Sequence, residues 1–397
     1  MSMTQWGAVR TLALTLTLVW SCAPGQTKQE AAIASARQAL ADEIGVVVDD
    51  IEVVEFEDVV WGDASLGCPE PGMTYSRAVE SGYRIVLAAA DETYDFHGSD
   101  HRGPFLCRPE TLENGSFTAE LDGVEIHYEV HGKGPVVMAV PVSWGLDIGG
   151  LRGLLGGLEK KLTMVYFDPR GIGGSSGVRD AADMSMEAVR QDFDHLRAYL
   201  GLDQVNAIGW SNGAANLILL AAEHPETLSS AIFVHGVASF TREDGAEFAK
   251  KFPQLTQAQM AFIQEMADES LTDAMRTERF KELWLTQFFP SQVADPESGH
   301  ELIAEAFGGA EFSYAHGSYA NQESMGGFDT REQLPGIPVR SLVIAGRYDM
   351  SPPEKVKVLA DGLPDSVYVL FENSGHFSPI EEPELFEKTV FGFLGVD

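Results

Sequence analysis

The residues with the clearest chemical potential lie in the stretch Gly209-Trp210-Ser211-Asn212-Gly213. An apolar, strand-like run (205–210) precedes Ser211 and a helical run (214–222) follows it, which predicts a sharp strand-to-helix turn. Such a turn strains the backbone of the serine, and small flanking residues let the strand and the helix pass closely. The backbone N–H of Asn212 would begin the helix, where it can stabilise a developing oxyanion. The spacing therefore predicts Ser211 as a nucleophile.

A serine nucleophile needs a base, and His376 is the candidate among the ten histidines. It follows the last predicted strand, whereas we interpret the other nine histidines as surface or structural residues. An acid must then fix the imidazole tautomer, and Asp349 stands directly after the strand predicted over residues 341–345. The chain order Ser211, Asp349, His376 is typical of one class of serine hydrolase. We expect these three residues to be catalytic.

The elements around these residues alternate between strands and helices from about residue 117 to the end of the chain. This alternation predicts a mostly parallel sheet with helices on both faces. After a hairpin over residues 117–131, buried strands are expected at 136–140, 163–167, 205–210, 231–234, 341–345 and 367–371. The segment 241–333 interrupts the pattern with amphipathic stretches, which predict helices near 256–268, 272–289 and 297–307. We interpret this segment as a helical cap.

The first 22 residues have the composition of a secretory signal: Arg10, an apolar run from Leu12 to Trp20, and then Ser21-Cys22. Val19-Trp20-Ser21-Cys22 resembles a bacterial lipobox, in which the cysteine becomes the lipidated N-terminus. The alternative is an ordinary signal that is cleaved nearby. We expect an exported protein, periplasmic or at the cell surface, with a possible lipid anchor at Cys22.

A small α+β domain is predicted over residues 28–110, from one amphipathic helix followed by strands. Cys68 and Cys107 are the two cysteines left after the signal. An even pair in an exported chain predicts a disulfide. The alternative, two free thiols or a metal site, lacks the close Cys/His spacing that zinc needs. Nothing in this domain assembles a catalytic set.

The formal net charge of −33 argues against nucleic acid or an anionic membrane surface as a partner, because both would repel such a surface. The stretch Gly171-Ile172-Gly173-Gly174 lacks the spacing of a dinucleotide-binding loop. We expect no metal and no organic cofactor. The expected partner is a small-molecule or short-peptide substrate, and the oligomeric state is left open.

Residues 117–397 resemble α/β-hydrolases of the proline iminopeptidase group. The resemblance rests on Phe167-Asp168-Pro169-Arg170-Gly171, on Gly346-Arg347-Tyr348-Asp349 and on Ser374-Gly375-His376. It implies an α/β-hydrolase fold and hydrolysis of an N-terminal residue, often proline, from short peptides. Related members of the group cleave esters or other amides. By position, the resemblance gives Ser211, Asp349 and His376 the roles already inferred for them.

The chain departs from this group at the oxyanion loop, where many members carry His-Gly-Gly-Pro-Gly and this sequence has Pro141-Val142-Ser143-Trp144-Gly145. Position matching gives the second oxyanion donor as the N–H of Ser143, or of Trp144. A backbone N–H donates whatever its side chain, so the departure leaves the oxyanion hole possible. We expect Trp210 to line the substrate site; Trp144 either does so too or belongs to the core.

An aminopeptidase must also bind the protonated amine of its substrate. Carboxylates of the cap could do so by ion pairing: Glu265, Glu301, Glu305, Glu311 and Glu323. The main alternative function is a carboxylesterase or lactonase with the same catalytic residues. A second alternative is a surface binding protein in which the hydrolase fold is inert.

Overall fold

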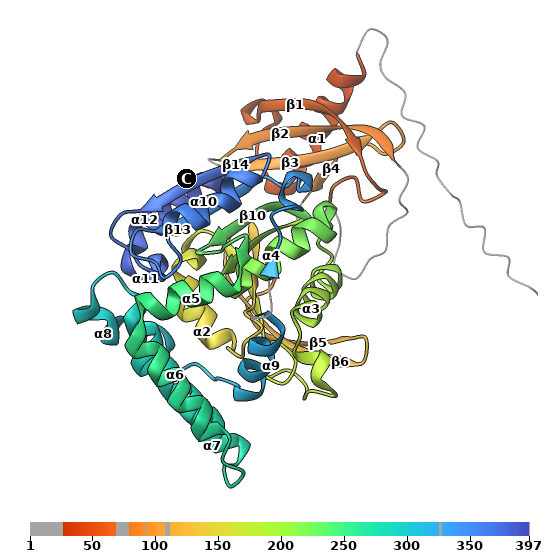
Figure 1. Ribbon diagram of the computed structural model, residues 1–397. Coiled ribbons are helices and arrows are strands. Elements are labelled where there is room, and N and C mark those ends of the chain that lie inside the picture. Colours follow the sequence, from red (N-terminus) through yellow and green to blue (C-terminus); the bar gives the residue numbers. More distant parts are fainter. Residues whose placement is uncertain (1–26, 69–78, 91, 108–111, 325–327, 397) are drawn as a thin grey trace, which may run out of the picture. The chain divides into compact units, whose positions relative to one another are not determined.

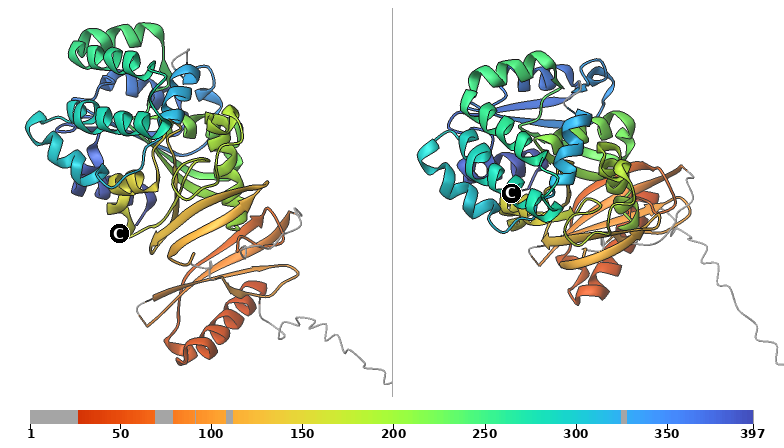
Figure 2. Two further views of the ribbon diagram at one scale, coloured as in Figure 1. Left: turned by 90° about the horizontal axis from the view of Figure 1, so that it is seen from below. Right: turned by 60° about the horizontal axis from the view of Figure 1, so that its bottom comes forward.

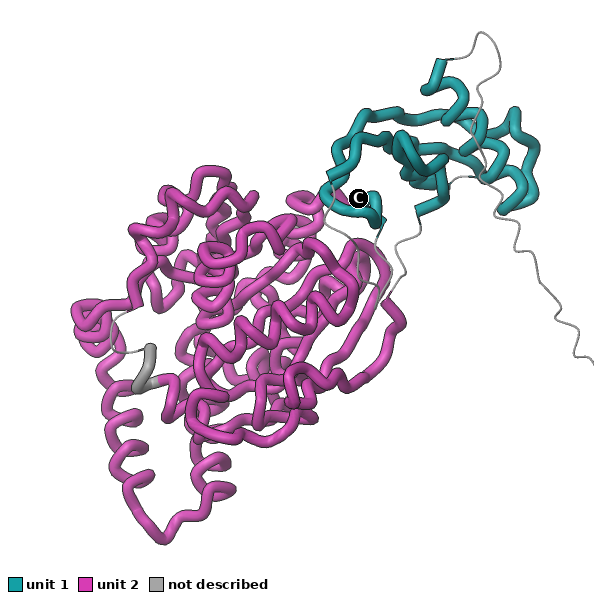
Figure 3. Tube along the Cα trace, turned by 90° about the vertical axis from the view of Figure 1, so that its right-hand side faces the viewer, with its two compact units in different colours: residues 1–110 teal, residues 111–397 magenta. Residues whose placement is uncertain are grey.

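The computed structural model describes residues 27–68, 79–90, 92–107, 112–324 and 328–396. The chain divides into two compact units, residues 1–110 and 111–397 (Figure 3). The expected secretory segment and Cys22 lie outside the described residues. Within the described ranges, no helix combines the length and the apolar character that crossing a membrane requires.

The described residues of the first unit form an α-helix packed on a four-stranded antiparallel sheet (Figure 2). Helix α1 (Lys28–Ile44) begins at a capping box between Thr27 and Glu30 and ends at Gly45, whose φ is 72°. Its buried face carries Ala32, Ala36 and Leu40, which recur every four residues and pack against the sheet. The strands follow in sheet order: β1 (Glu52–Trp61), β2 (Glu80–Ala89), β3 (Glu92–Ser99) and β4 (Phe105–Cys107).

Cys68 and Cys107 form a disulfide in this unit, with their Cα atoms 5.7 Å apart. The prediction of a bridge between these residues is confirmed. The bridge closes a segment of 39 residues, which restricts the unfolded chain and thereby stabilises a unit with a small core.

The second unit contains an eight-stranded mixed sheet with the order β14-β13-β10-β9-β7-β8-β6-β5. Figure 1 labels five of these strands, β14, β13, β10, β6 and β5. Six of these strands, β7 to β10, β13 and β14, are parallel to one another. At one edge of the sheet, β6 pairs antiparallel with β8, and β5 pairs antiparallel with β6. The bounds are β5 (Gly115–Leu121), β6 (Val124–Gly132), β7 (Val136–Val140), β8 (Thr163–Phe167), β9 (Val205–Trp210), β10 (Leu228–Val234), β13 (Ser341–Gly346) and β14 (Ser366–Phe371).

Helices cover both faces of this sheet. Successive residues of a strand point to opposite faces, so Met138 and Val140 of β7 join one core while Val137 and Ala139 join the other. The first core includes α3 (Met186–Tyr199), α4 (Asn212–Glu223) and α10 (Pro353–Gly362), and the second includes α2 (Ile148–Leu155) and α12 (Pro383–Leu394). Because both faces are covered, β8 and β13 are buried along their whole length. The predicted fold class, a helix-covered and mostly parallel sheet, is confirmed.

The cap segment leaves and rejoins the sheet domain through two short antiparallel strands, β11 (Ser239–Phe240) and β12 (Phe328–Asp329). Between them lie α5 (Arg242–Lys251), α6 (Pro253–Met266), α7 (Asp273–Leu283), α8 (Pro296–Phe307) and α9 (Tyr314–Ser324). Helices α6 and α7 lie side by side (Figure 1). The helix that the sequence predicts over 272–289 ends as α7 at Leu283 and continues as a π-helical turn, Trp284–Phe288, before Pro290.

Candidate active site

Ser211 stands where β9 meets α4, as its flanking residues predict. Its φ of 54° and ψ of −116° are unusual for a residue other than glycine. A Cβ atom on Gly209 would lie 2.4 Å from the carbonyl oxygen of Gly213, so the strand and the helix approach each other across the serine. The Ser211 N–H donates to the carbonyl of Val234 at the end of the neighbouring strand, 2.9 Å away. Backbone strain of this kind is typical of a functional position.

Asp349 and His376, the residues expected to act as acid and base, lie together. Their side chains are almost fully buried, and His376 Nδ1 is 3.0 Å from Asp349 Oδ1. The loop that carries His376 is held on both sides of the histidine, because Glu381 accepts hydrogen bonds from the N–H groups of Gly375 and Phe377. The imidazole is therefore fixed by the acid and by its own backbone.

Within the described residues, no hydrogen bond joins the Ser211 hydroxyl to His376. The two are linked instead through Trp210, whose Nε1–H donates to the carbonyl oxygen of His376 at 2.9 Å. The rings of Trp210 and His376 are 5.4 Å apart. Contacts between a nucleophile and its base often tighten only when the substrate is bound.

The expectation that Trp210 lines the substrate site is wrong for this structure. The residue is only 1% exposed, and its ring packs against Phe289, Phe307 and Phe377 in the core. The reason is the alternation of the strand: Trp210 is the last residue of β9 and its side chain points into the sheet-helix layer. Its indole supports the base loop.

The oxyanion loop also differs from expectation at Ser143. The N–H of Ser143, predicted as the second oxyanion donor, donates to Oδ1 of Asn212 at 2.7 Å, and the Ser143 hydroxyl donates to the same atom at 2.8 Å. This N–H is therefore already engaged. Within the described part of the chain, the N–H of Trp144 has no hydrogen-bond partner, and neither does that of Asn212 at the start of α4.

A second histidine, His235, contacts Asp349, although it is not among the residues that the sequence predicts as catalytic. Its Nδ1 is 2.7 Å from Asp349 Oδ2, so the two carboxylate oxygens each face one imidazole. His235 follows β10 directly, as Ser211 follows β9. A polar residue at the carboxyl end of a parallel strand beside the nucleophile was the available signal.

The electrostatics of this cluster follow from burial and pairing. Burial alone would raise the pKa of Asp349, but the proximity of His376 and the hydrogen bonds from His235 and His376 hold it well below its usual range. Burial lowers the pKa of His235, although its hydrogen bond to Asp349 acts in the opposite direction. Burial raises the pKa of Glu381. Asp349 is thus an anion and His235 is a neutral imidazole near pH 7.

Aromatic side chains of the cap face the oxyanion loop. Trp144 is half-buried and stacks on Trp284 of the π-helical turn, with ring centroids 4.5 Å apart and planes 2° from parallel. Phe289 and Phe312 also contact the Trp144 ring. Of the cap carboxylates considered for amine binding, Glu265, Glu301, Glu305 and Glu311 are exposed, and Glu265 pairs with Arg279. The Glu323 side chain lies outside the described residues.

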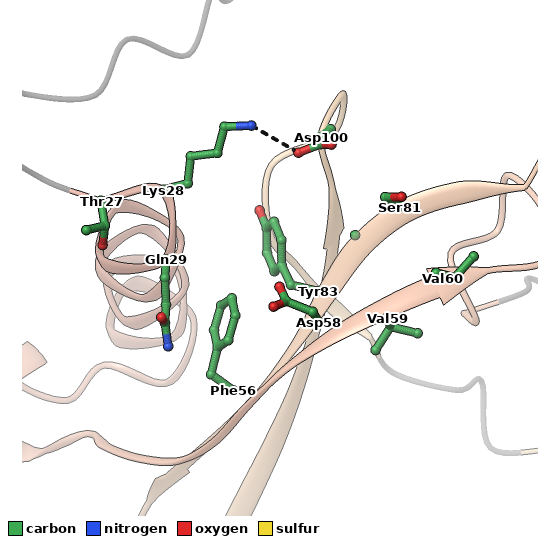
Figure 4. Close-up of a pocket in the computed structure, with 11 residues that line it drawn as sticks. Thr27, Lys28, Gln29, Phe56, Asp58, Val59, Val60, Ser81, Tyr83 and Asp100 are labelled. Atoms are coloured by element: carbon green, nitrogen blue, oxygen red, sulfur yellow. Dashed lines mark hydrogen bonds and ion pairs between the residues drawn. The ribbon is translucent and has the colours of Figure 1, made fainter.

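His235, Asp349 and His376 also offer three metal-ligating atoms within 4.8 Å of one another. The hydrogen bonds between these side chains account for that arrangement without a metal. The first unit contains a separate cavity of about 490 Å³, lined in part by Phe56 and Tyr83 (Figure 4). No histidine or cysteine is among the described residues that line it.

Two family models match the chain, one in each unit. A domain of unknown function matches residues 33–107, and the alpha/beta hydrolase fold matches residues 148–383. A proline iminopeptidase of Clostridioides difficile is 24% identical over 60% of this chain and 82% of its own length. A pimeloyl-[acyl-carrier protein] methyl ester esterase of Aeromonas hydrophila is also 24% identical, over 68% of this chain and all of its own.

The structure of an α/β fold family hydrolase from Bacillus anthracis superimposes with a TM-score of 0.58 at 18% identity, over 70% of this chain and 99% of that one. At that identity the likeness concerns the fold alone. The hydrolase model, in contrast, spans more than half of the 397 residues. The chain therefore belongs to the α/β-hydrolase fold family.

Proposed function

We propose that this protein is a serine hydrolase that works by acyl transfer, with Ser211 as nucleophile, His376 as base and Asp349 as the acid that orients it. The observation that carries the proposal is the buried pair of Asp349 and His376, 3.0 Å apart, in the same domain as a serine held at a φ of 54°. A buried acid that accepts the Nδ1–H of a histidine leaves its Nε2 free to take a proton.

In the proposed mechanism His376 removes the Ser211 proton as the hydroxyl attacks a carbonyl carbon. The oxyanion would be stabilised by the N–H of Asn212 and by that of Trp144, since the N–H of Ser143 is engaged by the Asn212 side chain. His376 then protonates the leaving group, and water attacks the acyl-enzyme with His376 again as base. No step requires a cofactor.

The first candidate substrate class is the N-terminal residue of a short peptide. It is supported by similarity to proline iminopeptidases, such as that of Clostridioides difficile. This activity requires a group that binds the protonated amine, and the four described carboxylates considered for it are exposed rather than buried beside the aromatic residues: Glu265, Glu301, Glu305 and Glu311. Among the carboxylates considered, the amine would be bound by Glu323 or by one of these exposed residues.

The second candidate class is a carboxylic ester or lactone, which the aromatic lining of the cap favours. Trp144, Trp284 and Phe312 offer apolar surface for an acyl chain or ring without requiring an ion pair. The esterase of Aeromonas hydrophila is among the relatives of this chain.

Turnover of prolyl, alanyl and leucyl p-nitroanilides, compared with that of short p-nitrophenyl esters, would decide between these classes. Anilide cleavage that disappears in Ser211→Ala would establish an aminopeptidase, and ester cleavage alone would establish an esterase. If Ser211→Ala retained the full turnover, the serine mechanism would be wrong. Silence on every substrate, together with no labelling of Ser211 by a fluorophosphonate, would favour the inert binding protein.

We also propose that the protein is exported, with a lipid anchor at Cys22. The proposal rests on the apolar segment before Cys22 and is supported by the disulfide of the first unit. The mass of the mature N-terminus tests it, because lipidation would add diacylglycerol to a chain that begins at Cys22.

A further inference from the structure

We propose that His235 is a positioning residue for the acid: it binds one oxygen of Asp349 so that the other faces His376. The inference rests on the proposed serine hydrolase function and adds to it a second histidine. A carboxylate can turn about its last side-chain bond, because that torsion is broad. One hydrogen bond therefore does not fix its plane, whereas bonds to both oxygens do.

The contacts of Asp349 divide between its two oxygens. Oδ1 accepts from His376 Nδ1 at 3.0 Å and from the N–H of Ser351 at 2.9 Å, whereas Oδ2 faces His235 Nδ1 at 2.7 Å. The side chains of His235 and Asp349 are both 0% exposed, so water does not replace either bond. Removing His235 would leave a buried, charged oxygen without a donor.

The tautomer of His235 follows from its other nitrogen. The N–H of Ser378 points at His235 Nε2 over 3.3 Å, and the Ser378 hydroxyl lies 2.9 Å from the same atom. A backbone N–H can only donate, so Nε2 must be the acceptor. The proton of the neutral ring is then on Nδ1, where it is donated to Asp349. Asp349 and His376 are the charged or titratable groups that act on this ring.

The backbone of His235 connects it to the acid as well. Its φ of 55° lies in the left-handed region, and its N–H donates to Ile344 in β13, the strand that leads to Asp349. Asparagine, aspartate and histidine enter that region more readily than other residues with a side chain. His235 thus follows the end of β10 and is hydrogen-bonded both to β13, the strand that leads to Asp349, and to the Asp349 side chain.

Two substitutions at His235 separate donation from packing. Asparagine tolerates the left-handed backbone and its amide nitrogen can take the place of Nδ1, whereas leucine fills part of the volume but has no donor. We expect His235→Leu to lower kcat by about 10²-fold, the cost of a misplaced catalytic group, with KM changed less than about twofold. His235→Asn should restore most of the lost kcat.

The pH profile adds a readout that a purely structural role would not move. Without the His235 bond, Asp349 attracts the imidazolium of His376 more strongly, so the acid limb of kcat/KM should move to higher pH in His235→Leu and less in His235→Asn. If His235→Leu keeps both kcat and the acid limb of the wild type, the proposal is overturned. Equal loss in both variants, in proportion to lost thermal stability, would also overturn it.

A measurement on the wild-type protein keeps the inference separate from the enzyme mechanism and from the folding of the variants. In ¹⁵N-histidine NMR spectra, His235 should carry its proton on Nδ1 and stay neutral through pH 7, and the resonance should move in Asp349→Asn. A proton on Nε2 would refute the positioning role. If instead the tautomer is as expected but wild type and Ser211→Ala are equally inactive on every substrate, the proposed function fails and the His235–Asp349 contact stands.

Discussion

The turns at Ser211 and His235 share a positive φ angle and differ in the element that comes next in the chain. Both residues come directly after neighbouring parallel strands, whose last residues Trp210 and Val234 are paired in register, and their φ angles are 54° and 55°. After Ser211 a helix begins at once, which places free N–H groups beside the hydroxyl. After His235 the chain runs to β11 and the cap instead. In the proposed mechanism, one residue with a positive φ presents the nucleophile with its oxyanion donors, and the other supports the acid.

The largest effect is expected from Ser211→Ala, which removes the nucleophile and leaves His235 untouched. The kcat/KM of the best substrate should fall by about 10⁴-fold or more, because the acyl-enzyme can no longer form. The urea midpoint of unfolding should stay near that of the wild type. If kcat/KM fell only as far as it does in His235→Leu, the two turns would contribute equally to catalysis and Ser211 would not be the nucleophile.

Asp349→Asn should come next, since it weakens the contacts of both histidines at once. We expect kcat to fall by about 10³- to 10⁴-fold, because an amide cannot stabilise the imidazolium of His376 and disturbs its tautomer. The exposed Asp361 of α10 provides the control, and Asp361→Asn should leave kcat unchanged. Steady-state kinetics on Asp349→Asn and Asp361→Asn measures these effects. A larger loss of kcat in His235→Leu than in Asp349→Asn would contradict the prediction.

The glycines beside the two turns should differ in the free energy of unfolding that they contribute. In Gly209→Ala the new methyl group would lie 2.4 Å from the backbone of Gly213, which cannot move without displacing α4, so we expect a loss of about 3 kcal/mol or more. In Gly236→Ala it would meet the Ala214 side chain at 2.6 Å, with other atoms at 3.8 Å or beyond, and about 1–2 kcal/mol should be lost.

Urea unfolding measures both losses. Gly392→Ala is the matched control, because that glycine lies in α12 with no described atom within 4 Å of the added group. It should stabilise the protein by about 0.5–1 kcal/mol. Equal losses at Gly209 and Gly236 would show that the Ser211 turn is no more closely packed than the His235 turn.

Asn212→Ala tests how the Ser211 turn holds the oxyanion loop. The Asn212 side chain accepts from the N–H of Ser143, and Asn216, one turn later in α4, donates to the carbonyl of Pro141. We expect kcat to fall by about tenfold, because the loop that carries the Trp144 N–H, the proposed oxyanion donor, is held less firmly. A rise in kcat would instead indicate that the freed N–H of Ser143 is the better donor.

The smallest effect concerns the pH dependence of stability. Burial lowers the pKa of His235 and of His316 in the folded state, so as the pH falls below about 6.5 the unfolded chain takes up protons that the folded one does not. The free energy of unfolding should therefore decrease toward lower pH, by at most about 1.4 kcal/mol per pH unit for each histidine. His235→Asn should flatten the curve between pH 7 and 5; an unchanged slope would mean that His235 does not titrate on unfolding.

The sequence predicted well the features that depend on local patterns. The strands, the position of Ser211 on a strand-to-helix turn and the placement of Asp349 and His376 after strands all follow from residues close in the chain. The helices expected at 256–268 and 297–307 appear as α6 and α8 with shifts of a few residues. The helix expected to reach 289 gives way to the π-helical turn because Pro290 and the aromatic contacts of Trp284 reshape its end.

The features that the sequence did not predict depend on contacts between distant residues. The proposed role of His235 depends on Asp349, 114 residues later, and the end of a parallel strand was the single local signal that pointed to it. The engagement of Ser143 depends in the same way on the side chain of Asn212, 69 residues away. Trp210 was misplaced because its proximity to Ser211 in sequence hides the direction in which the last residue of a strand points.

The attachment of the proposed base, His376, to the cap constrains how this protein can diverge. The N–H of His376 donates to the carbonyl of Gln292 at 2.8 Å, and Glu381, which holds the base loop, also accepts from the N–H of Ala294. Residues 292–294 therefore serve the base as well as the cap. Among the described residues, no hydrogen bond joins the helical pair α6 and α7 to the loop that carries His376, so we expect substitutions there to disturb His376 less than a change in the backbone path of residues 292–294.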